Sequence, residues 1–243
     1  RRAQTKVEAV GDKVFYVHAV CVEVDGTPYA LELVSPIRME DLRSDEDASV
    51  LNQLLLRNRQ VYIDSATHVY NRRYFDDRLR DLDGEFTLAM LDLDHFKHIN
   101  DTYGHDWGDQ YIRRTGQCLR DNTPAGTVCA RLSGDEFLVL FHGYRSRDAV
   151  REKIDCLTKA MQQSVALLPS GNALHISLSG GIAWYPDDGQ DWETLKKYAD
   201  FAMYQVKHSE KGRVEEFDIG VYNREAYAER TRREFRQLLS NAQ

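Results

Sequence analysis

The spacing of hydrophobic and polar positions changes twice along the chain, which divides it into three stretches. In the first stretch, residues 13–24 and 29–34 are rich in β-branched and aromatic side chains and flank the turn dipeptide Asp25-Gly26. This pattern predicts a β-hairpin. Because an isolated hairpin is only marginally stable, we interpret residues 1–40 as the tail of a truncated upstream domain. Packing of the hairpin on the domain that follows is the alternative.

The second stretch, from Ser44 to Asp64, is polar and carries apolar residues at helical spacing, so we assign residues 41–64 to a linker helix. Two interpretations of its apolar positions are equally open. Either the helix packs singly on its own domain, or it forms a parallel two-helix seam in which Asn58 sets the register. The residues of this seam would be Leu51, Leu55, Asn58 and Tyr62.

In the third stretch, short apolar segments alternate with longer segments of helical periodicity. The expected strands are 86–91, 127–131, 137–142, 174–184 and 214–217, and the expected helices are 96–103, 109–119, 147–168 and 192–211. We therefore predict an α+β domain over residues 65–217, in which helices flank a central, mostly antiparallel sheet. Residues 218–243 are expected to form a solvent-exposed helical extension, either a plain surface helix or a connector to a further domain.

Composition and charge narrow the class of protein. The chain is 42% hydrophobic and 29% charged, as in ordinary globular domains, and its four cysteines are too widely spaced for a C-x-x-C pair. Its net charge of −7 argues against nucleic acid as a partner. No apolar run approaches the ~20 residues that cross a bilayer. We therefore expect a cytoplasmic fragment without membrane contact, cut from a longer protein whose other parts could anchor it in a membrane.

The first concentration of candidate chemistry follows the apolar segment that ends at Leu91. Asp92 stands where side chains leave the core, and a carboxylate in this position is a suitable ligand for a hard cation. Lys97 follows closely enough to meet phosphate oxygens that such a cation also binds. By itself, the segment is equally compatible with a strand that ends in a polar turn.

The second concentration is a turn of small residues between two expected strands. Ser133 and Gly134 lead into the adjacent carboxylates Asp135 and Glu136. Glycine permits the positive φ or close backbone approach that a tight hairpin needs and that an approaching phosphate benefits from. Because consecutive strand residues point to opposite faces, we expect the two carboxylates to have different roles. Taken alone, such a turn is more often purely structural.

The two segments are more informative together than apart. If the strand that ends at Asp92 lies beside the hairpin, Asp92 and Asp135 converge. Two carboxylates and a backbone carbonyl can hold one or two Mg²⁺ ions on a triphosphate, so the pair predicts a site of nucleotidyl transfer.

Five segments, in order, resemble those of GGDEF domains, the diguanylate cyclases that condense two GTP molecules into cyclic dimeric GMP. The resemblance covers residues 64–217 and implies the fold that this family shares with nucleotide cyclases. The signature reads SGDEF in this chain. The segments are DSATHVYNRRYF (64–75), LDLDHFKHINDTYGHDWGD (91–109), RLSGDEF (131–137), SLSGGIA (177–183) and ADFAMYQVKHSEKGR (199–213).

The resemblance implies metal ligands and a catalytic acid. Asp92, Asp135 and the backbone carbonyl of Leu93 would hold Mg²⁺, with Mn²⁺ as an alternative. Glu136 would be the second signature acid and would assist the metal or the activation of the 3′-hydroxyl.

The resemblance also implies how GTP is bound. Asn100 and Asp109 would read the guanine edge, since a carboxylate accepts the N1 and N2 hydrogens that adenine lacks. The triphosphate would be held by backbone amides and by cationic side chains. These groups are the amides near His95 and Phe96, and Lys97, Lys207 and Lys211.

The implied reaction is the attack of the 3′-hydroxyl of one GTP on the α-phosphorus of another, performed twice with release of two pyrophosphates. Since one site holds one GTP, the active species is expected to be a homodimer with two-fold symmetry. The linker helix would bring the subunits together, and residues 1–40 would belong to an upstream, PAS-like sensor domain.

The chain departs from the family pattern in four places. Ser133 replaces the first signature glycine and should fit the turn if its φ is negative, but strain it by ~1 kcal/mol if its φ is positive. The family segment Leu-Thr-Gly-Leu reads ATHV at residues 66–69, and Glu210, where glycine is usual, is expected to raise the KM for GTP. The Arg-x-x-Asp site of product inhibition is absent, because its two positions are Pro124 and Thr127.

Two other functions are open at this stage. The first is a catalytically degenerate module that binds GTP or a partner protein; the presence of both candidate metal acids, Glu136 and the guanine pair favours catalysis over it. The second is a cyclase that makes a mononucleotide, which shares the metal chemistry and is distinguished by its product.

Overall fold

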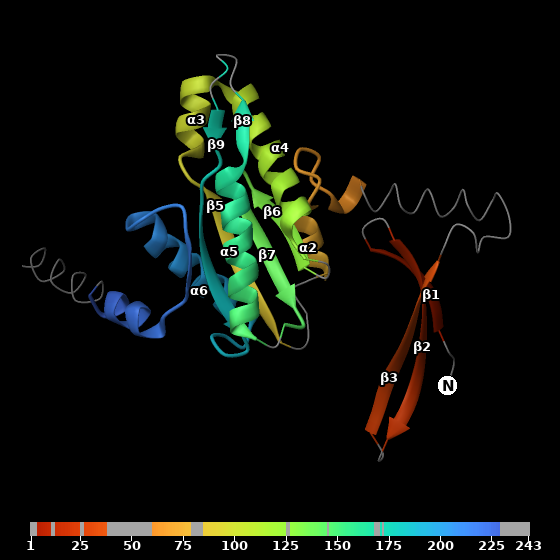
Figure 1. The fold of residues 1–243 in the computed structure, drawn as a ribbon. Coiled ribbons are helices and arrows are strands. Elements are labelled where there is room, and N and C mark those ends of the chain that lie inside the picture. Colours follow the sequence, from red (N-terminus) through yellow and green to blue (C-terminus); the bar gives the residue numbers. More distant parts are fainter. Residues whose placement is uncertain are drawn as a thin grey trace, which may run out of the picture. The chain divides into compact units, whose positions relative to one another are not determined.

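The computed structural model describes the following parts of the chain: residues 4–10, 13–24, 27–37, 60–78, 85–124, 127–144, 146–167, 171 and 173–228. Contacts divide the chain into two compact units, Arg1–Ile63 and Asp64–Gln243 (Figure 1). None of the described helices is long and apolar enough to cross a membrane.

The N-terminal unit contains a sheet of three antiparallel strands, β1 (Gln4–Val10), β2 (Lys13–Val24) and β3 (Thr27–Ile37). The predicted hairpin is present as β2 and β3. Strand β1, which pairs with β2, was not predicted, because its sequence QTKVEAV has too few apolar residues to show a pattern. Residues 60–62 are helical, and most of the predicted linker helix lies outside the described residues. The assignment of residues 1–40 to a sensor domain stays a prediction.

The C-terminal unit is built on a six-stranded sheet in the order β11-β10-β5-β7-β6-β4. Neighbours among β10, β5, β7 and β6 are antiparallel, whereas the edge strands β4 and β11 run parallel to their neighbours. The predicted α+β class with a mostly antiparallel central sheet is therefore confirmed. The strands are β4 (Tyr70–Asn71), β5 (Phe86–Leu93), β6 (Thr127–Ser133), β7 (Glu136–His142), β10 (Leu178–Tyr185) and β11 (Val214–Glu216).

The helices of this unit are α2 (Arg72–Arg78), α3 (Phe96–Tyr103), α4 (His105–Asn122), α5 (Arg147–Gln163) and α6 (Trp192–His208). The helix predicted over 147–168 ends earlier, because Ser164 is extended and strand β8 (Val165–Leu167) follows. The strand predicted over 174–184 is two strands, since β9 (Ala173–His175) leaves the main sheet to pair with β8. Of the expected C-terminal extension, residues 219–228 are helical and residues 229–243 are not described.

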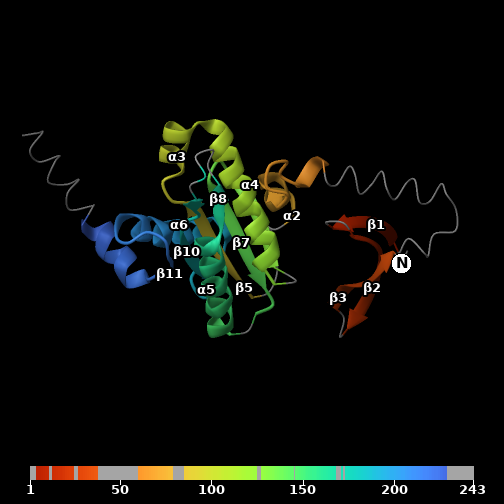
Figure 2. The same ribbon diagram turned by 45° about the horizontal axis from the view of Figure 1, so that its top comes forward.

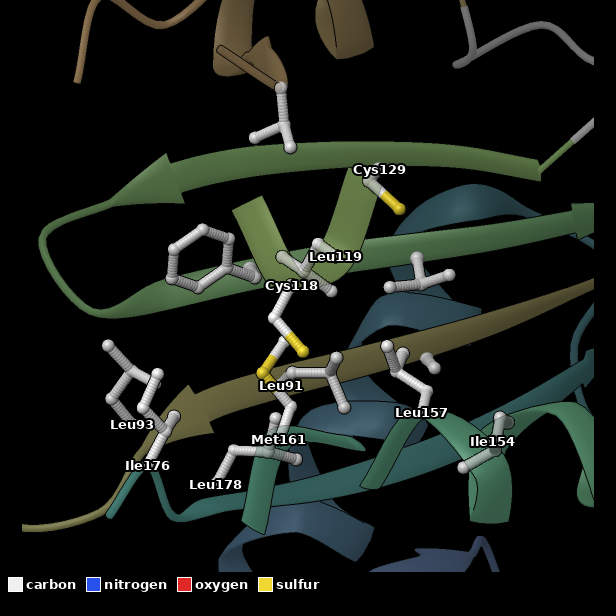
Figure 3. Packing of buried hydrophobic residues seen from close by; sticks show 14 of the residues in the cluster. Leu91, Leu93, Cys118, Leu119, Cys129, Ile154, Leu157, Met161, Ile176 and Leu178 are labelled. Atoms are coloured by element: carbon white, nitrogen blue, oxygen red, sulfur yellow. The ribbon is translucent and has the colours of Figure 1, made fainter. Parts of the chain in front are cut away.

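The alternation of side chains in the strands builds a core on both faces of the sheet. Ala89, Leu91 and Leu93 of β5 belong to a cluster with α4 and α5, and Figure 3 shows Leu91 close to Cys118 of α4 and Met161 of α5. Helix α6 packs on β10 and β5 from the other face (Figures 1 and 2). This approach requires glycine at Gly181, because a Cβ there would lie 2.1 Å from the carbonyl oxygen of Ala199.

Candidate functional site

Asp92 lies where β5 leaves the middle of the sheet. Because β5 is hydrogen-bonded to β10 on one side and to β7 on the other, Asp92 is only 7% exposed. Glu136, the first residue of β7, stands directly opposite Asp92 across the strand pair. Directly opposed residues share a face of the sheet, so the two carboxylates lie on one side.

The signature turn brings Asp135 to the same end of β5. The backbone N–H of Leu93 donates to the carbonyl oxygen of Asp135 at 3.1 Å. The positive φ in the turn belongs to Gly134 (30°) and not to Ser133, so serine fits without backbone strain. The Ser133 hydroxyl donates to Oε2 of Glu136 at 2.8 Å. The predicted convergence of the two acidic segments is therefore present in the structure.

The three carboxylates influence one another electrostatically. Burial raises the pKa of Asp92 above its usual value, and the negative charges of Asp135 and Glu136 raise this pKa further. The opposing influence is Lys207 in the last turn of α6, whose Nζ lies 2.6 Å from Oδ2 of Asp92. Concentrated negative charge with oxygen donors is the environment that a hard cation prefers.

The donor set fits Mg²⁺ or Mn²⁺ in kind, because every candidate ligand is an oxygen atom. Among the residues that the structure describes, no three His, Cys, Asp or Glu side chains form a group that could hold a metal ion by themselves. Asp92 and Asp135 would therefore need further ligands from the backbone, from solvent or from a bound nucleotide. The carbonyl of Leu93 is the predicted backbone ligand.

Arg131 ties the signature turn to the beginning of the unit. Its Nε and Nη2 donate to the carbonyl oxygen of Gly134 at 3.0 and 2.8 Å, and its Nη1 donates to Oδ1 of Asp64 at 3.2 Å. The same Oδ1 accepts hydrogen bonds from the backbone N–H and the hydroxyl of Thr67. Burial by itself raises the pKa of Asp64, but the donors of Thr67 and the charge of Arg131 outweigh it and lower this pKa below its usual value.

The segment that replaces Leu-Thr-Gly-Leu keeps a glycine-like backbone without the glycine. His68, at the third position, has a φ of 57°, in the left-handed region that glycine adopts without strain. Its backbone N–H donates to the carbonyl oxygen of Asp64 at 2.9 Å. The departure from the family pattern therefore leaves the turn in place and puts strain on one exposed residue.

The predicted phosphate-binding residues lie around the start of α3 and the end of α6. His95 has a φ of 59° and turns the chain from β5 into α3. The first backbone amides of a helix lack partners within it and favour anions, which applies here to Phe96 and Lys97. Lys97 and Lys211 are exposed, whereas Lys207 lies against Asp92.

The predicted guanine-reading residues lie on successive helices, Asn100 on α3 and Asp109 on α4. A Cβ at Gly108 would lie 1.8 Å from Oδ1 of Asn100, so this glycine lets the amide approach the start of α4. Asp109 is exposed, and its Oδ2 lies 3.9 Å from Nη2 of Arg113. The structure thus places the Asn100 side chain next to the residue before Asp109, which is compatible with a contact of both residues to one base.

Comparisons with known proteins decide the family. The family described as "Diguanylate cyclase, GGDEF domain" matches residues 61–213, which is more than half of the chain. The chain belongs to this family. The GGDEF resemblance inferred from the five segments is therefore confirmed.

Curated relatives agree with this assignment. The bifunctional diguanylate cyclase/cyclic di-GMP phosphodiesterase MucR of Pseudomonas aeruginosa is 37% identical over 181 residues, which are 69% of this chain and 26% of that protein. The probable diguanylate cyclase DgcC of Escherichia coli is 32% identical over 159 residues, 63% of this chain and 42% of that protein. The chain therefore spans less than half of the length of these relatives.

Solved structures share the fold. The GGDEF domain of TpbB (YfiN) from Pseudomonas aeruginosa superimposes with a TM-score of 0.61 at 30% identity, covering 65% of this chain and 95% of that one. The GGDEF domain of DgcB from Caulobacter crescentus, in complex with c-di-GMP, gives a TM-score of 0.58 at 28% identity and covers 64% and 95% of the two chains.

The structure describes the surroundings of two departures of this GGDEF domain from the family sequence, at Glu210 and at Pro124 and Thr127. After α6, the positive φ belongs to Gly212 (82°), and Oε2 of Glu210 lies 3.8 Å from Nη1 of Arg213. The effect of Glu210 on the KM stays a prediction. At the two positions where the sequence predicts that the inhibitory site is missing, the Thr127 N–H donates to the carbonyl oxygen of Pro124, and neither side chain carries a charge.

Residues of this GGDEF domain that the sequence analysis missed lie beside the predicted site. Asp94 is 3% exposed and accepts hydrogen bonds from the hydroxyls of Ser177 at 2.6 Å and Ser179 at 2.7 Å. Burial raises the pKa of Asp200 on α6, and the charge of Glu136 raises it further, which brings Asp200 into the electrostatic surroundings of the site. The two serines in the segment SLSGGIA were the only sequence signal for Asp94.

A cavity of about 200 Å³ lies at the other end of the sheet of this GGDEF domain. Two of its charged side chains pair with each other, since Nη2 of Arg147 lies 2.5 Å from Oδ2 of Asp187. The guanidinium of Arg147 also covers the ring of Trp184, 4.8 Å from its centroid. The cavity is lined by none of the predicted site residues, which lie at the end of β5 that carries Asp92.

Proposed function

We propose that this GGDEF domain is an active diguanylate cyclase, which condenses two GTP molecules into cyclic di-GMP and two pyrophosphates. The convergence of Asp92, Asp135 and Glu136 at one end of β5, with Lys207 against them, carries this proposal. Two further findings support it. MucR is described as a diguanylate cyclase and DgcC as a probable one, and the similar GGDEF domain of DgcB binds c-di-GMP in its structure.

The site residues divide the chemical work. Mg²⁺ or Mn²⁺, held by Asp92, Asp135 and the Leu93 carbonyl, would supply charge neutralisation at the phosphates. Glu136 accepts the proton of the attacking 3′-hydroxyl as its oxygen bonds to the α-phosphorus and the bond to pyrophosphate breaks. The phosphates are held by the lysines and the amides at the start of α3, which are contributed by His95, Phe96, Lys97, Lys207 and Lys211.

Selectivity and assembly follow from the same site. Asn100 and Asp109 accept and donate hydrogen bonds at the guanine edge and so favour GTP over ATP. Because one site binds one GTP, two copies must face each other in a two-fold arrangement for each new bond to form. The specific activity should therefore rise with protein concentration.

The test is incubation of the purified chain with GTP and Mg²⁺, with the product identified by its mass. Asp135→Ala and Glu136→Ala are assayed in parallel, and ATP replaces GTP in a control. We expect cyclic di-GMP from GTP alone, and none from either variant. GTP binding without any product would identify a degenerate binding module, and a cyclic mononucleotide would identify a different cyclase.

A further inference from the structure

The ion pair between Lys207 and Asp92 joins two groups with competing tasks. Nζ of Lys207 lies 2.6 Å from Oδ2 of Asp92, with side chains that are 30% and 9% exposed. Asp92 is a predicted metal ligand, and Lys207 is a predicted ligand of the triphosphate. In the structure, the two residues bind each other.

The Asp92 carboxylate needs a positively charged partner. Its carboxylate is largely buried and lies near the negative charges of Asp135 and Glu136. A buried charge without a partner is strongly unfavourable. Among the described residues, Lys207 is the cation within ion-pair distance of this carboxylate.

A divalent cation on Asp92 changes the balance. Two positive charges on one carboxylate lie a few ångströms apart and repel each other, so the ammonium group is driven towards another acceptor. The described side chains cannot complete a metal site by themselves. A triphosphate answers both needs, because its oxygens are ligands for the metal and acceptors for the ammonium.

We propose that Lys207 is an exchangeable counter-ion, which leaves Asp92 for the nucleotide phosphates when the metal binds, so that metal and triphosphate bind as a unit. This inference rests on the proposed function for the identity of the ligands. It predicts that the metal-free, nucleotide-free site resists divalent cations. It also gives Lys207 a role that the other phosphate-binding lysines do not have, since Lys97 and Lys211 are exposed and are not partners of Asp92 in the described structure.

The experiment measures Mn²⁺ binding by the loss of the electron paramagnetic resonance signal of the free ion. Titrations are run with and without a GTP analogue that lacks the 3′-hydroxyl and cannot react. In the unaltered protein, the analogue should tighten Mn²⁺ binding by about tenfold or more. In Lys207→Met, Mn²⁺ alone should bind about tenfold more tightly than to the unaltered protein. The analogue should then tighten Mn²⁺ binding by a smaller factor than in the unaltered protein, because it still supplies metal ligands but no longer has to displace the lysine.

Two control variants make the result specific. Lys97→Met removes a predicted phosphate ligand that does not contact Asp92, so it should weaken binding of the analogue and leave the affinity for Mn²⁺ alone unchanged. Lys207→Arg keeps the positive charge, so its affinity for Mn²⁺ alone should be as low as that of the unaltered protein. Circular dichroism verifies that each variant is folded. Unchanged or weaker binding of Mn²⁺ alone to folded Lys207→Met would overturn the exchange.

The outcome separates this inference from the proposed function. If the unaltered protein makes cyclic di-GMP but Lys207→Met binds Mn²⁺ like the unaltered protein, the cyclase stands and the exchange is wrong. If Mn²⁺ and the analogue bind as a unit through Lys207 but GTP gives no product, the exchange stands and the chain is a binding module.

Discussion

Asp92 and Asp94 lie at the same end of β5, are both buried, and have opposite surroundings. Asp94 accepts hydrogen bonds from two serine hydroxyls that neighbouring backbone holds in place. Asp92 faces two repelling carboxylates and one lysine at the end of a flexible side chain. A carboxylate that is hydrogen-bonded to fixed partners, as Asp94 is, stabilises the folded structure. A buried carboxylate close to other negative charges can instead bind a cation or take part in a reaction. Such unfavourable clusters of charge are characteristic of functional sites.

The largest expected effect is on catalysis at Asp92. If the proposed function is correct, Asp92→Asn should lower the rate of cyclic di-GMP formation by about 10³-fold, because the predicted metal ligand would be lost and with it charge stabilisation of several kcal/mol. Chromatography of the product measures the rate, and urea unfolding shows whether the variant keeps its stability. Near-normal activity of the variant would place Asp92 with Asp94 among the structural carboxylates.

Asp94 should show the reverse pattern. Asp94→Asn should reduce the free energy of unfolding by about 3 kcal/mol, because two charge-assisted hydrogen bonds are replaced by weaker neutral ones and one serine hydroxyl hydrogen loses its acceptor. Urea unfolding measures the change. The matched control is Asp101→Asn, which alters an exposed aspartate of α3 and should change the stability by less than about 0.5 kcal/mol.

Asp64 is a third carboxylate for this comparison, and its contribution to stability should depend on pH. Asp64→Asn should cost about 1.5 kcal/mol of unfolding free energy at neutral pH, since donors from Thr67 and Arg131 lose their charged acceptor. The pKa of Asp64 is lowered by folding, so its stabilisation is fully present above its ordinary pKa of 3.8 and disappears as the pH falls through the lower value of the folded state. Urea unfolding of both proteins, from about pH 2.5 to about pH 7, measures how their difference in unfolding free energy changes as carboxyl groups titrate. A difference between the two proteins that did not shrink in acid would refute it.

The smallest expected effect concerns the turn that holds Asp64. His68→Gly should increase the free energy of unfolding by about 1 kcal/mol, because glycine adopts the left-handed conformation of this position without strain. His98→Gly is the matched control and should have the opposite sign, with a loss of about 1 kcal/mol, because this histidine lies within helix α3. Thermal unfolding of both variants measures the two changes, and a loss of stability in His68→Gly would contradict the assignment of strain.

Much of the fold could be predicted because its signals are local. The apolar runs of β5 and β7 and the amphipathic pattern of α3 gave these elements to within a few residues. The break between β9 and β10 could not be predicted from the sequence, because apolar and polar residues alternate through LHISLS, across the break. The chain turns there because of distant partners, such as the carbonyl of Ser164 and the hydroxyl of Tyr111, which bind the backbone of Ile176 and Ser177.

The site was predictable to a similar extent. Asp92, Asp135 and Glu136 stand beside apolar strands and small turn residues, so their convergence follows from the topology. Lys207 was found only through the family resemblance, since nothing local distinguishes it from other helical lysines. Arg131 and Asp94 were missed because their roles depend on partners 67 and 83 residues away in the chain.

The bond between Arg131 and Asp64 has a consequence for protein engineering. Asp64, the first residue of the C-terminal unit, also supports the signature turn through the Arg131 guanidinium that binds the carbonyl of Gly134. A chimaera that joins a new input module to this GGDEF domain must therefore place its junction before Asp64. A junction only three residues later would remove Asp64, which accepts the hydrogen bonds of Thr67 and pairs with Arg131. The turn that presents Asp135 would then lose its outer support although the signature itself was untouched.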